Sequence, residues 1–280
     1  SASKIVLSTF FYLSALICYI QYMRNSKWQY LLASVVSSIL AMGCKEQSVI
    51  IVPCLLLFDW MLFKRNMRSL KVYIEKVYYL IPAIAIFIVT LVANKNTGEE
   101  IIGYTIVDRF IFLCYSSFKY LLISAIPFKL SYLYPFPFQV GEKIPMALWI
   151  YPFVILFIGY VIYLNRRKPL LVFCTLFFIL HLLPVLHVIP LPRYVVAADR
   201  YLYIPYIAFA IGLSILSYHL YERQRKWILY AGFLYCSYLC VYTAGYAPAW
   251  KNSDTLKEHF KEVLKKRETN LSINFKHEKQ

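Results

Sequence analysis

Residues 187–206 contain a His, two Arg, an Asp and four Tyr, and they lie between two long apolar runs. Charged groups beside a bilayer are costly and usually functional. The three prolines of this stretch favour a shaped loop over a helix. The candidate ligand-binding residues here are His187, Arg193, Asp199, Arg200, Tyr201 and Tyr203.

These side chains suit a ligand that bears a phosphate. The planar donor fork of Arg matches phosphate oxygens, and we expect Asp199-Arg200 to open the next apolar helix, where a helix N-terminus also favours an anion. A purely structural Asp-Arg pair that fastens the loop to its helix is an equally good interpretation. For His187, an interfacial role with a backbone partner competes with ligand binding.

A second charged pair, Lys45-Glu46, interrupts the apolar stretch 28–63. As a single helix this stretch would be about 54 Å long, well beyond a hydrocarbon core of about 30 Å. We therefore expect a turn that places Lys45 and Glu46 near the membrane surface. Lys45 would add a point charge to a phosphate site, or the two side chains would form only an ion pair with each other. The aromatic loop 132–138 is expected on the same side.

The composition is that of a membrane protein. Of 280 residues, 60% are hydrophobic and only 16% are charged, and the apolar residues form runs long enough to cross a bilayer as helices. We predict an all-α polytopic transmembrane bundle of about eight spanning helices, with residues 104–126 as an interfacial or re-entrant helix because polar residues interrupt them. The predicted spans are 5–23, 28–44, 48–63, 74–94, 146–164, 170–186, 203–220 and 227–245.

The net charge of +16 follows membrane topology rather than a nucleic-acid groove. Lys and Arg cluster in the short connections 24–27, 64–71, 166–168 and 223–226, which the predicted spans place on one face. The positive-inside rule makes that face cytoplasmic. Both ends of the chain and the loop 187–202 then lie on the opposite side. We expect an integral protein of a bacterial inner membrane with both ends periplasmic.

The remaining features are expected to be structural. The seven cysteines all fall in apolar segments, where small buried side chains are a better interpretation than disulfides or metal ligands. Residues 254–267 carry an apolar stripe typical of an amphipathic helix. We therefore divide the chain into a membrane domain, residues 1–250, and the start of a periplasmic or lumenal helical region, residues 251–280.

Three stretches resemble motifs of one family. Ala-Ala-Asp-Arg-Tyr-Leu-Tyr-Ile-Pro, residues 197–205, resembles Ala-(Asp/Glu)-Arg-Tyr-x-Tyr-Leu-Pro. Residues 38–59 resemble a Ser-Lys-Glu-x-x-(hydrophobic)-x-x-Pro-x-x-Leu-x-x-x-Asp segment. Trp-Lys-Asn-Ser-Asp-Thr-Leu, residues 250–256, is similar to Trp-x-(Asn/Asp)-Ser-x-x-Leu. Cys44 stands where the pattern has Ser, and Ile204 where it has Leu. The family is the O-mannosyltransferase-like membrane proteins of GT-C type that carry C-terminal tetratricopeptide repeats.

The resemblance implies a glycosyltransferase that moves a sugar from a polyprenyl-phosphate donor to a protein hydroxyl on the periplasmic or lumenal side. It implies that Lys45-Glu46 and Asp199-Arg200-Tyr201 form a donor-phosphate and pocket-shaping set. The carboxylate that acts as base in this family is expected upstream of Ser1, so we interpret the chain as a fragment. Membrane lipids and an acceptor or partner protein bound by the repeats are the other expected partners.

Two further functions remain open at this point. One is a non-catalytic membrane scaffold that recruits partners through C-terminal repeats. The other is a flippase or transporter for lipid-linked sugars, which should carry polar residues at mid-membrane depth, and the apolar runs contain few of them. No metal ligand set or cofactor is predicted beyond the lipid-linked donor itself.

Overall fold

The computed structural model describes residues 2–94, 104–128, 130, 131, 133–186, 195–222, 227–252, 254 and 255. Within these ranges the chain is helical and has no β-strand, only an isolated bridge between Tyr134 and Ala197. The α-helices are α1 Ala2–Asn25, α2 Trp28–Cys44, α3 Ile51–Met61, α4 Leu70–Asn94, α5 Ile106–Ala125, α6 Ile150–Leu164, α7 Pro169–Leu182, α8 Pro205–Glu222 and α9 Trp227–Tyr246. Short 3-10 helices are η1 Glu46–Ile50, η2 Met146–Trp149, η3 Leu183–Val185, η4 Asp199–Leu202 and η5 Ala247–Trp250.

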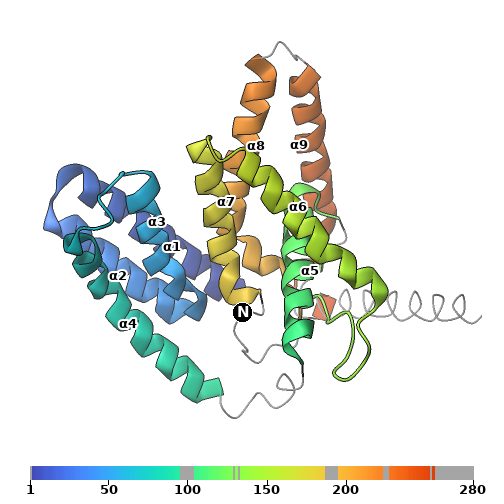
Figure 1. The fold of residues 1–280 in the computed structure, drawn as a ribbon, viewed down its shortest axis with the longest axis horizontal. Helices are drawn as coiled ribbons and strands as arrows, with labels where there is room; N and C mark the ends of the chain where they lie inside the picture. Colours follow the sequence, from blue (N-terminus) through green and yellow to red (C-terminus); the bar gives the residue numbers. More distant parts are fainter. Residues whose placement is uncertain are drawn as a thin grey trace, which may run out of the picture.

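The helices form two groups that meet at α3 and α7. Helices α1 to α4 pack together in the first group, with α1 against α2, and both α2 and α3 against α4. In the second group α5 packs against α6, α7 against α8, and α8 against α9. The contact between α3 and α7 joins the groups (Figure 1).

Four helices are long and apolar enough to cross a membrane. They are Ser3–Asn25, Leu70–Thr90, Met146–Leu164 and Trp227–Trp250, while Trp28–Cys44 and Pro169–Val185 are shorter apolar helices. Helix α3 has 11 residues, which is too short to span a hydrocarbon core alone. The prediction of an all-α membrane protein is therefore supported, but a count of eight spans is not confirmed.

Most helix positions agree with the predicted runs because the polar and proline residues between the runs do end the helices. The chain leaves the helical conformation at Lys45, where φ is −153°, so the predicted break of the 28–63 stretch is confirmed. Residues 106–125 form one uninterrupted helix, begun by a capping box in which Thr105 and Asp108 bond each other's backbone. This helix is not one of the four that are long and apolar enough to cross a membrane, and its interfacial or re-entrant placement stays a prediction.

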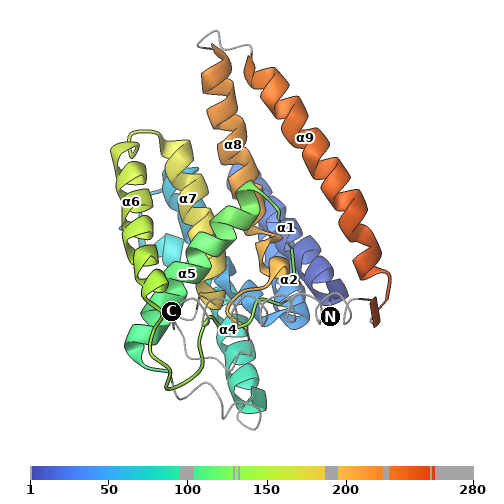
Figure 2. The ribbon, with the colours of Figure 1, turned by 90° about the vertical axis from the view of Figure 1, so that its right-hand side faces the viewer.

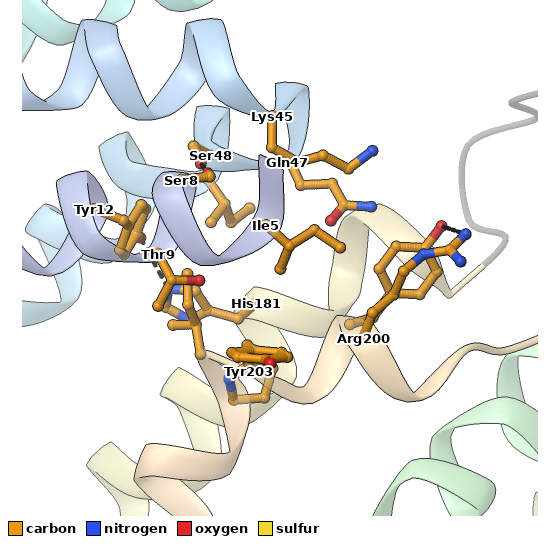
Figure 3. Close-up of a pocket in the computed structure, with 14 residues that line it drawn as sticks. Ile5, Ser8, Thr9, Tyr12, Lys45, Gln47, Ser48, His181, Arg200 and Tyr203 are labelled. Atoms are coloured by element: carbon orange, nitrogen blue, oxygen red, sulfur yellow. Dashed lines mark hydrogen bonds between the residues drawn. The ribbon is translucent and has the colours of Figure 1, made fainter. Parts of the chain in front are cut away.

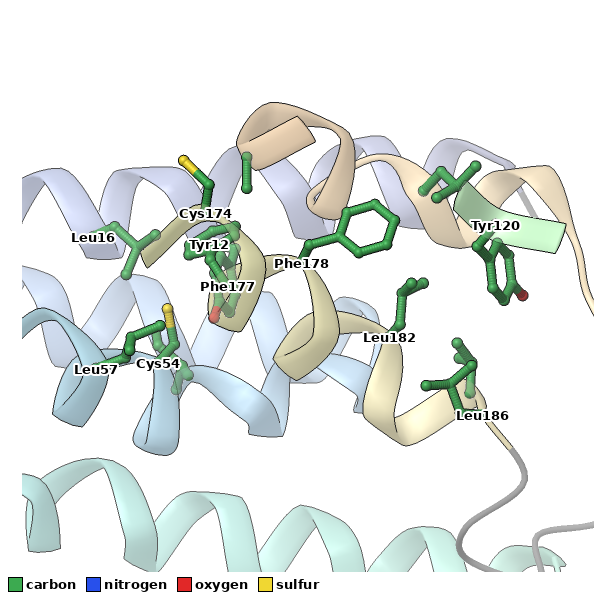
Figure 4. Packing of buried hydrophobic residues seen from close by; sticks show 14 of the residues in the cluster. Tyr12, Leu16, Cys54, Leu57, Tyr120, Cys174, Phe177, Phe178, Leu182 and Leu186 are labelled. Carbon is green, nitrogen blue, oxygen red and sulfur yellow. The ribbon is translucent and has the colours of Figure 1, made fainter. Parts of the chain in front are cut away.

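The core lies where α1, α3 and α7 meet (Figure 4). Aromatic rings fill it, including Phe58 of α3 at 5.3 Å from Phe173 of α7, measured between ring centroids in an edge-to-face arrangement. This geometry is the preferred one for aromatic pairs. In contrast, α6 and α9 bury none of their residues, which leaves apolar helix surfaces outside, as lipid contact requires.

The cysteines confirm their structural interpretation only in part. Cys54, Cys114 and Cys174 are buried, as small apolar side chains would be, whereas Cys236 and Cys240 on α9 are exposed and contradict the prediction of burial. The reason is that α9 buries no side chain at all. The predicted amphipathic helix 254–267 and nearly all of the region 251–280 lie outside the described residues.

Candidate functional site

A small cavity brings the two charged motifs of the sequence together. It lies between the start of α1, the connection from α2 to α3, the end of α7 and the segment from η4 to α8 (Figure 3). Lys45 and Arg200 both line it, and no Asp or Glu is among its lining residues. The lining consists of Ile5, Ser8, Thr9, Tyr12, Lys45, Gln47, Ser48, Ile50, His181, Arg200, Tyr201, Tyr203, Ile204 and Pro205.

The cavity has a volume of about 40 Å³ in this conformation. One water molecule requires roughly 10–15 Å³ by this measure, so the space suits about three waters. A phosphate group would have to displace them and part the side chains around them.

Lys45 caps the end of α2 and reaches the cavity from its open side. Its Nζ donates to Glu46 Oε1 at 2.8 Å, with 25% and 43% of the two side chains exposed. The predicted ion pair is confirmed, and Glu46 itself is not among the lining residues. Exposed pairs of this kind contribute little to stability, so Lys45 can turn toward an anion at small cost.

Arg200 lies in η4, not at the start of α8, which begins only at Pro205. The prediction that Asp199-Arg200 opens the next apolar helix is therefore wrong, and the helix N-terminus does not contribute to anion binding here. The guanidinium of Arg200 lies 5.1 Å from the ring centroid of Tyr201 and donates from Nη2 to the Tyr201 hydroxyl at 3.4 Å (Figure 3). Tyr201 thus orients Arg200 through its ring face and its hydroxyl.

Asp199 turns away from Arg200. It accepts a hydrogen bond at Oδ1 from the Tyr134 hydroxyl at 2.8 Å, and the described residues show no ion pair between Asp199 and Arg200. Burial raises the pKa of Asp199 to about 7, against the opposing effects of the Tyr134 hydrogen bond and of the charge on Lys119. Asp199 therefore has a structural role, as in the second interpretation of the sequence. Its hydrogen-bond partner is Tyr134 rather than the neighbouring Arg200.

The same contact explains the aromatic loop 132–138. The Tyr134 amide donates to Ala197 O and the Val196 amide donates to Tyr134 O, both at 2.9 Å. The loop is thereby joined to the segment that bears Arg200, whereas the sequence predicted only that both lie on the same side. Of its other described aromatic residues, Phe138 stacks on Phe112 of α5 at 4.9 Å between centroids, and neither Phe136 nor Phe138 lines the cavity.

Several polar residues that were not among the predicted site residues also line the cavity, including Ser8, Tyr12, Ser48 and His181. His181 Nδ1 faces the Phe177 carbonyl oxygen at 2.8 Å, and its Nε2 lies 2.8 Å from the Tyr12 hydroxyl. A carbonyl can only accept, so Nδ1 carries the hydrogen and Nε2 accepts from Tyr12. His181 thereby joins α7 to α1. Ser8 bonds Ser48 at 2.7 Å between their hydroxyl oxygens.

The remaining predicted residues stand as follows. Tyr203 lines the cavity and is 53% exposed, so it lies at the mouth. His187 and Arg193 lie outside the described residues. Tyr12 and Ser8 lie four residues apart on one face of α1, but an apolar run gives no sign of which polar residues face a cavity.

A second group of polar residues, which we name the charge cluster, joins α1, α3 and α4. It consists of Tyr19, Tyr22, Asp59, Arg65, Glu75 and Lys76. Asp59 is fully buried; it accepts from Tyr19 at 2.6 Å and from Lys76 at 2.7 Å. Arg65 holds Glu75 with both of its terminal nitrogens.

The charge cluster contains two carboxylates and two cations, so its formal charge is zero. Tyr22 also donates to Glu75 at 3.2 Å, and the Nζ of Lys76 lies 4.5 Å from the ring centroid of Tyr19. The ionisable residues Asp59, Glu75 and Lys76 fall inside or beside apolar runs, which is a signal for paired or functional groups. Sequence reasoning passed over this signal. Because the charges satisfy one another, the cluster has no capacity left for an ionic ligand.

Among the described residues no group of three His, Cys, Asp or Glu side chains could hold a metal ion. Comparison with known proteins adds no assignment: no family model, no curated protein and no solved structure matches this chain.

Proposed function

We propose that this chain is part of a membrane glycosyltransferase of GT-C type, which moves a sugar from a polyprenyl-phosphate donor to a protein hydroxyl on the periplasmic or lumenal side. Lys45 and Arg200 would contact the donor phosphate. As the glycosidic bond breaks, negative charge grows on that phosphate, and cations fixed beside it lower the barrier. Tyr203 at the mouth would contact the sugar.

One observation carries the proposal. Lys45 and Arg200 come from opposite halves of the chain and line one cavity whose described lining contains no carboxylate. Lys45 also pairs with Glu46, but the Glu46 side chain is not part of the cavity lining. Two cations that share a cavity without a carboxylate suit an anionic ligand, and a phosphate on a lipid is the anion that an apolar bundle can receive from the membrane.

The test is donor binding by the purified full-length protein with Arg200→Lys. Lys keeps the charge but loses the donor fork and the flat stacking surface. A charge-assisted hydrogen bond contributes about 1.5–3 kcal/mol, so affinity for a polyprenyl-phosphate sugar should fall roughly 10- to 150-fold.

Arg166→Lys is a matched control. Arg166 also stacks on a tyrosine, with its guanidinium carbon 4.1 Å from the ring centroid of Tyr163, but it lies after α6 and away from the cavity. It should bind the donor as the unchanged protein does. Normal binding by Arg200→Lys together with a lower melting temperature would make Arg200 structural, and the scaffold function would then be the better proposal.

A further inference from the structure

A second space, the α3–α7 groove, is lined by residues of these two helices. It is an open groove of about 490 Å³, and all nine of its lining residues are apolar. They come from α3, from α7 and η3, and, with Met67, from the connection between α3 and α4. Its volume falls within the range of roughly 300–1,000 Å³ that ligand pockets occupy.

Met67, which lines the groove, belongs to the basic connection between α3 and α4, and we name the basic residues of this connection the basic rim. Lys64, Arg68 and Lys71 are exposed, and no carboxylate lies within ion-pair distance of them in the part of the chain that the structure describes. The nearest acids along the sequence, Asp59 and Glu75, are buried in the charge cluster with Arg65 and Lys76. Asp59 and Glu75 therefore do not neutralise Lys64, Arg68 or Lys71.

Two aromatic residues place this rim at a membrane surface. Trp60, 53% exposed, and Tyr73, 45% exposed, stand on either side of the basic connection. Trp and Tyr concentrate at the level of lipid headgroups. Basic residues at that level attract anionic headgroups, with each Lys or Arg contributing about a fivefold gain in affinity.

We propose that the α3–α7 groove is a binding site for an anionic phospholipid, with one acyl chain in the groove and the headgroup at Lys64 and Arg68. The apolar lining accepts hydrocarbon, the rim accepts the negative charge, and Trp60 lies where the two parts of a phospholipid join. This site is separate from the cavity of Lys45 and Arg200, and it does not depend on the proposed transferase activity.

The experiment is a lipid titration of the purified full-length protein in detergent, followed by native mass spectrometry. Phosphatidylglycerol should bind more tightly than phosphatidylcholine with the same acyl chains. Lys64→Gln with Arg68→Gln should weaken phosphatidylglycerol binding about 30-fold and leave phosphatidylcholine almost unchanged. Arg166→Gln with Arg167→Gln removes two cations from another exposed basic connection and should change neither.

The groove itself is tested by Ile179→Trp, which fills it with a larger side chain from a position that is 46% exposed. Binding of both lipids should fall, whereas Ile84→Trp, at a position on α4 that is 49% exposed, should leave it intact. As a second measurement, phosphatidylglycerol with brominated acyl chains should quench Trp60 when the other four tryptophans are phenylalanine.

Three results would overturn the proposal. Equal losses in the Lys64, Arg68 variant and in the Arg166, Arg167 variant would show that the net charge of the protein attracts lipid without a site. Full binding by folded Ile179→Trp, or no quenching of Trp60, would place the acyl chain elsewhere. Displacement of phosphatidylglycerol by an equal amount of polyprenyl phosphate would assign the groove to the donor tail.

Discussion

The charge cluster and the cavity gather charged side chains in opposite ways. In the charge cluster each carboxylate meets a cation, and two tyrosine hydroxyls bond the carboxylate oxygens. In the cavity Lys45 and Arg200 line one space that no carboxylate lines. Buried ions tolerate no loss of a partner, whereas cations beside a space can exchange water for a ligand. Carboxylates and cations buried together indicate a structural role, whereas cations that line a cavity without a carboxylate in its lining suit a binding role.

The largest expected effect is on the stability of the charge cluster. Asp59→Ala removes a fully buried carboxylate and leaves Lys76 and Arg65 with excess positive charge, which should lower the free energy of unfolding by about 3–5 kcal/mol. Thermal unfolding in detergent measures this loss. The protein that remains folded should bind the lipid-phosphate donor normally.

A paired replacement sharpens this prediction. Asp59→Leu together with Lys76→Met removes one charge of each sign and should cost less than the sum of the two single replacements, with a coupling of roughly 0.5–3 kcal/mol. If the two single losses in the free energy of unfolding simply add, Asp59 and Lys76 do not stabilise each other. The contrast between the charge cluster and the cavity would then be wrong for the charge cluster.

In the cavity the expected effect is on binding. Lys45→Met removes a cation whose present partner is a half-exposed Glu46, so stability should change by less than about 0.5 kcal/mol. Donor affinity should fall by roughly 1.5 kcal/mol or more, which is tenfold or greater. A stability loss as large as that of Asp59→Ala would contradict the distinction drawn here.

The pH dependence of stability tests Asp199. Burial raises its folded pKa to about 7, above its ordinary 3.8, while Tyr134 and Lys119 act in the opposite direction. The folded protein therefore binds more protons than the unfolded chain between these values. The contribution of Asp199 to the free energy of unfolding is fully present below pH 3.8. It is lost as the pH rises toward 7, by at most about 1.4 kcal/mol for each pH unit. Asp199→Asn should flatten the profile relative to the unchanged protein.

The smallest effect is expected at Tyr201. Tyr201→Phe keeps the ring on which Arg200 stacks and removes a hydroxyl that accepts only a 3.4 Å hydrogen bond. Donor affinity should fall by less than about 1 kcal/mol. Tyr201→Ala, which also removes the ring, should weaken donor binding more if the ring orients Arg200.

The helix positions could be predicted from the sequence because they depend on local features. Apolar runs and the polar residues between them set where helices form, and the break at Lys45 follows from the length of one run. For Lys45 and Arg200, the sequence predicted only that both lie on the same side of the membrane. Their shared cavity depends on how α1, α7 and η4 pack, and no local pattern carries that information.

The errors have the same origin. Asp199 and Arg200 are adjacent in sequence, so pairing them was the simplest hypothesis, but Asp199 bonds Tyr134, 65 positions away. The charge cluster likewise forms from three separate helices. Its members could have been found as ionisable residues in apolar runs, whereas their pairing could not, because side chains on different helices meet only in the packed fold.

The bridge between Tyr134 and Ala197 has a mechanical consequence. Its two backbone hydrogen bonds and the Tyr134–Asp199 hydrogen bond hold the two connections together as one unit. Arg200 directly follows Asp199 in this unit. To admit a phosphate, the Arg200 side chain can change its rotamer, or both connections can move together. A crosslink that anchored the 134 connection to α5 would therefore restrain Arg200 from a distance, without touching the cavity.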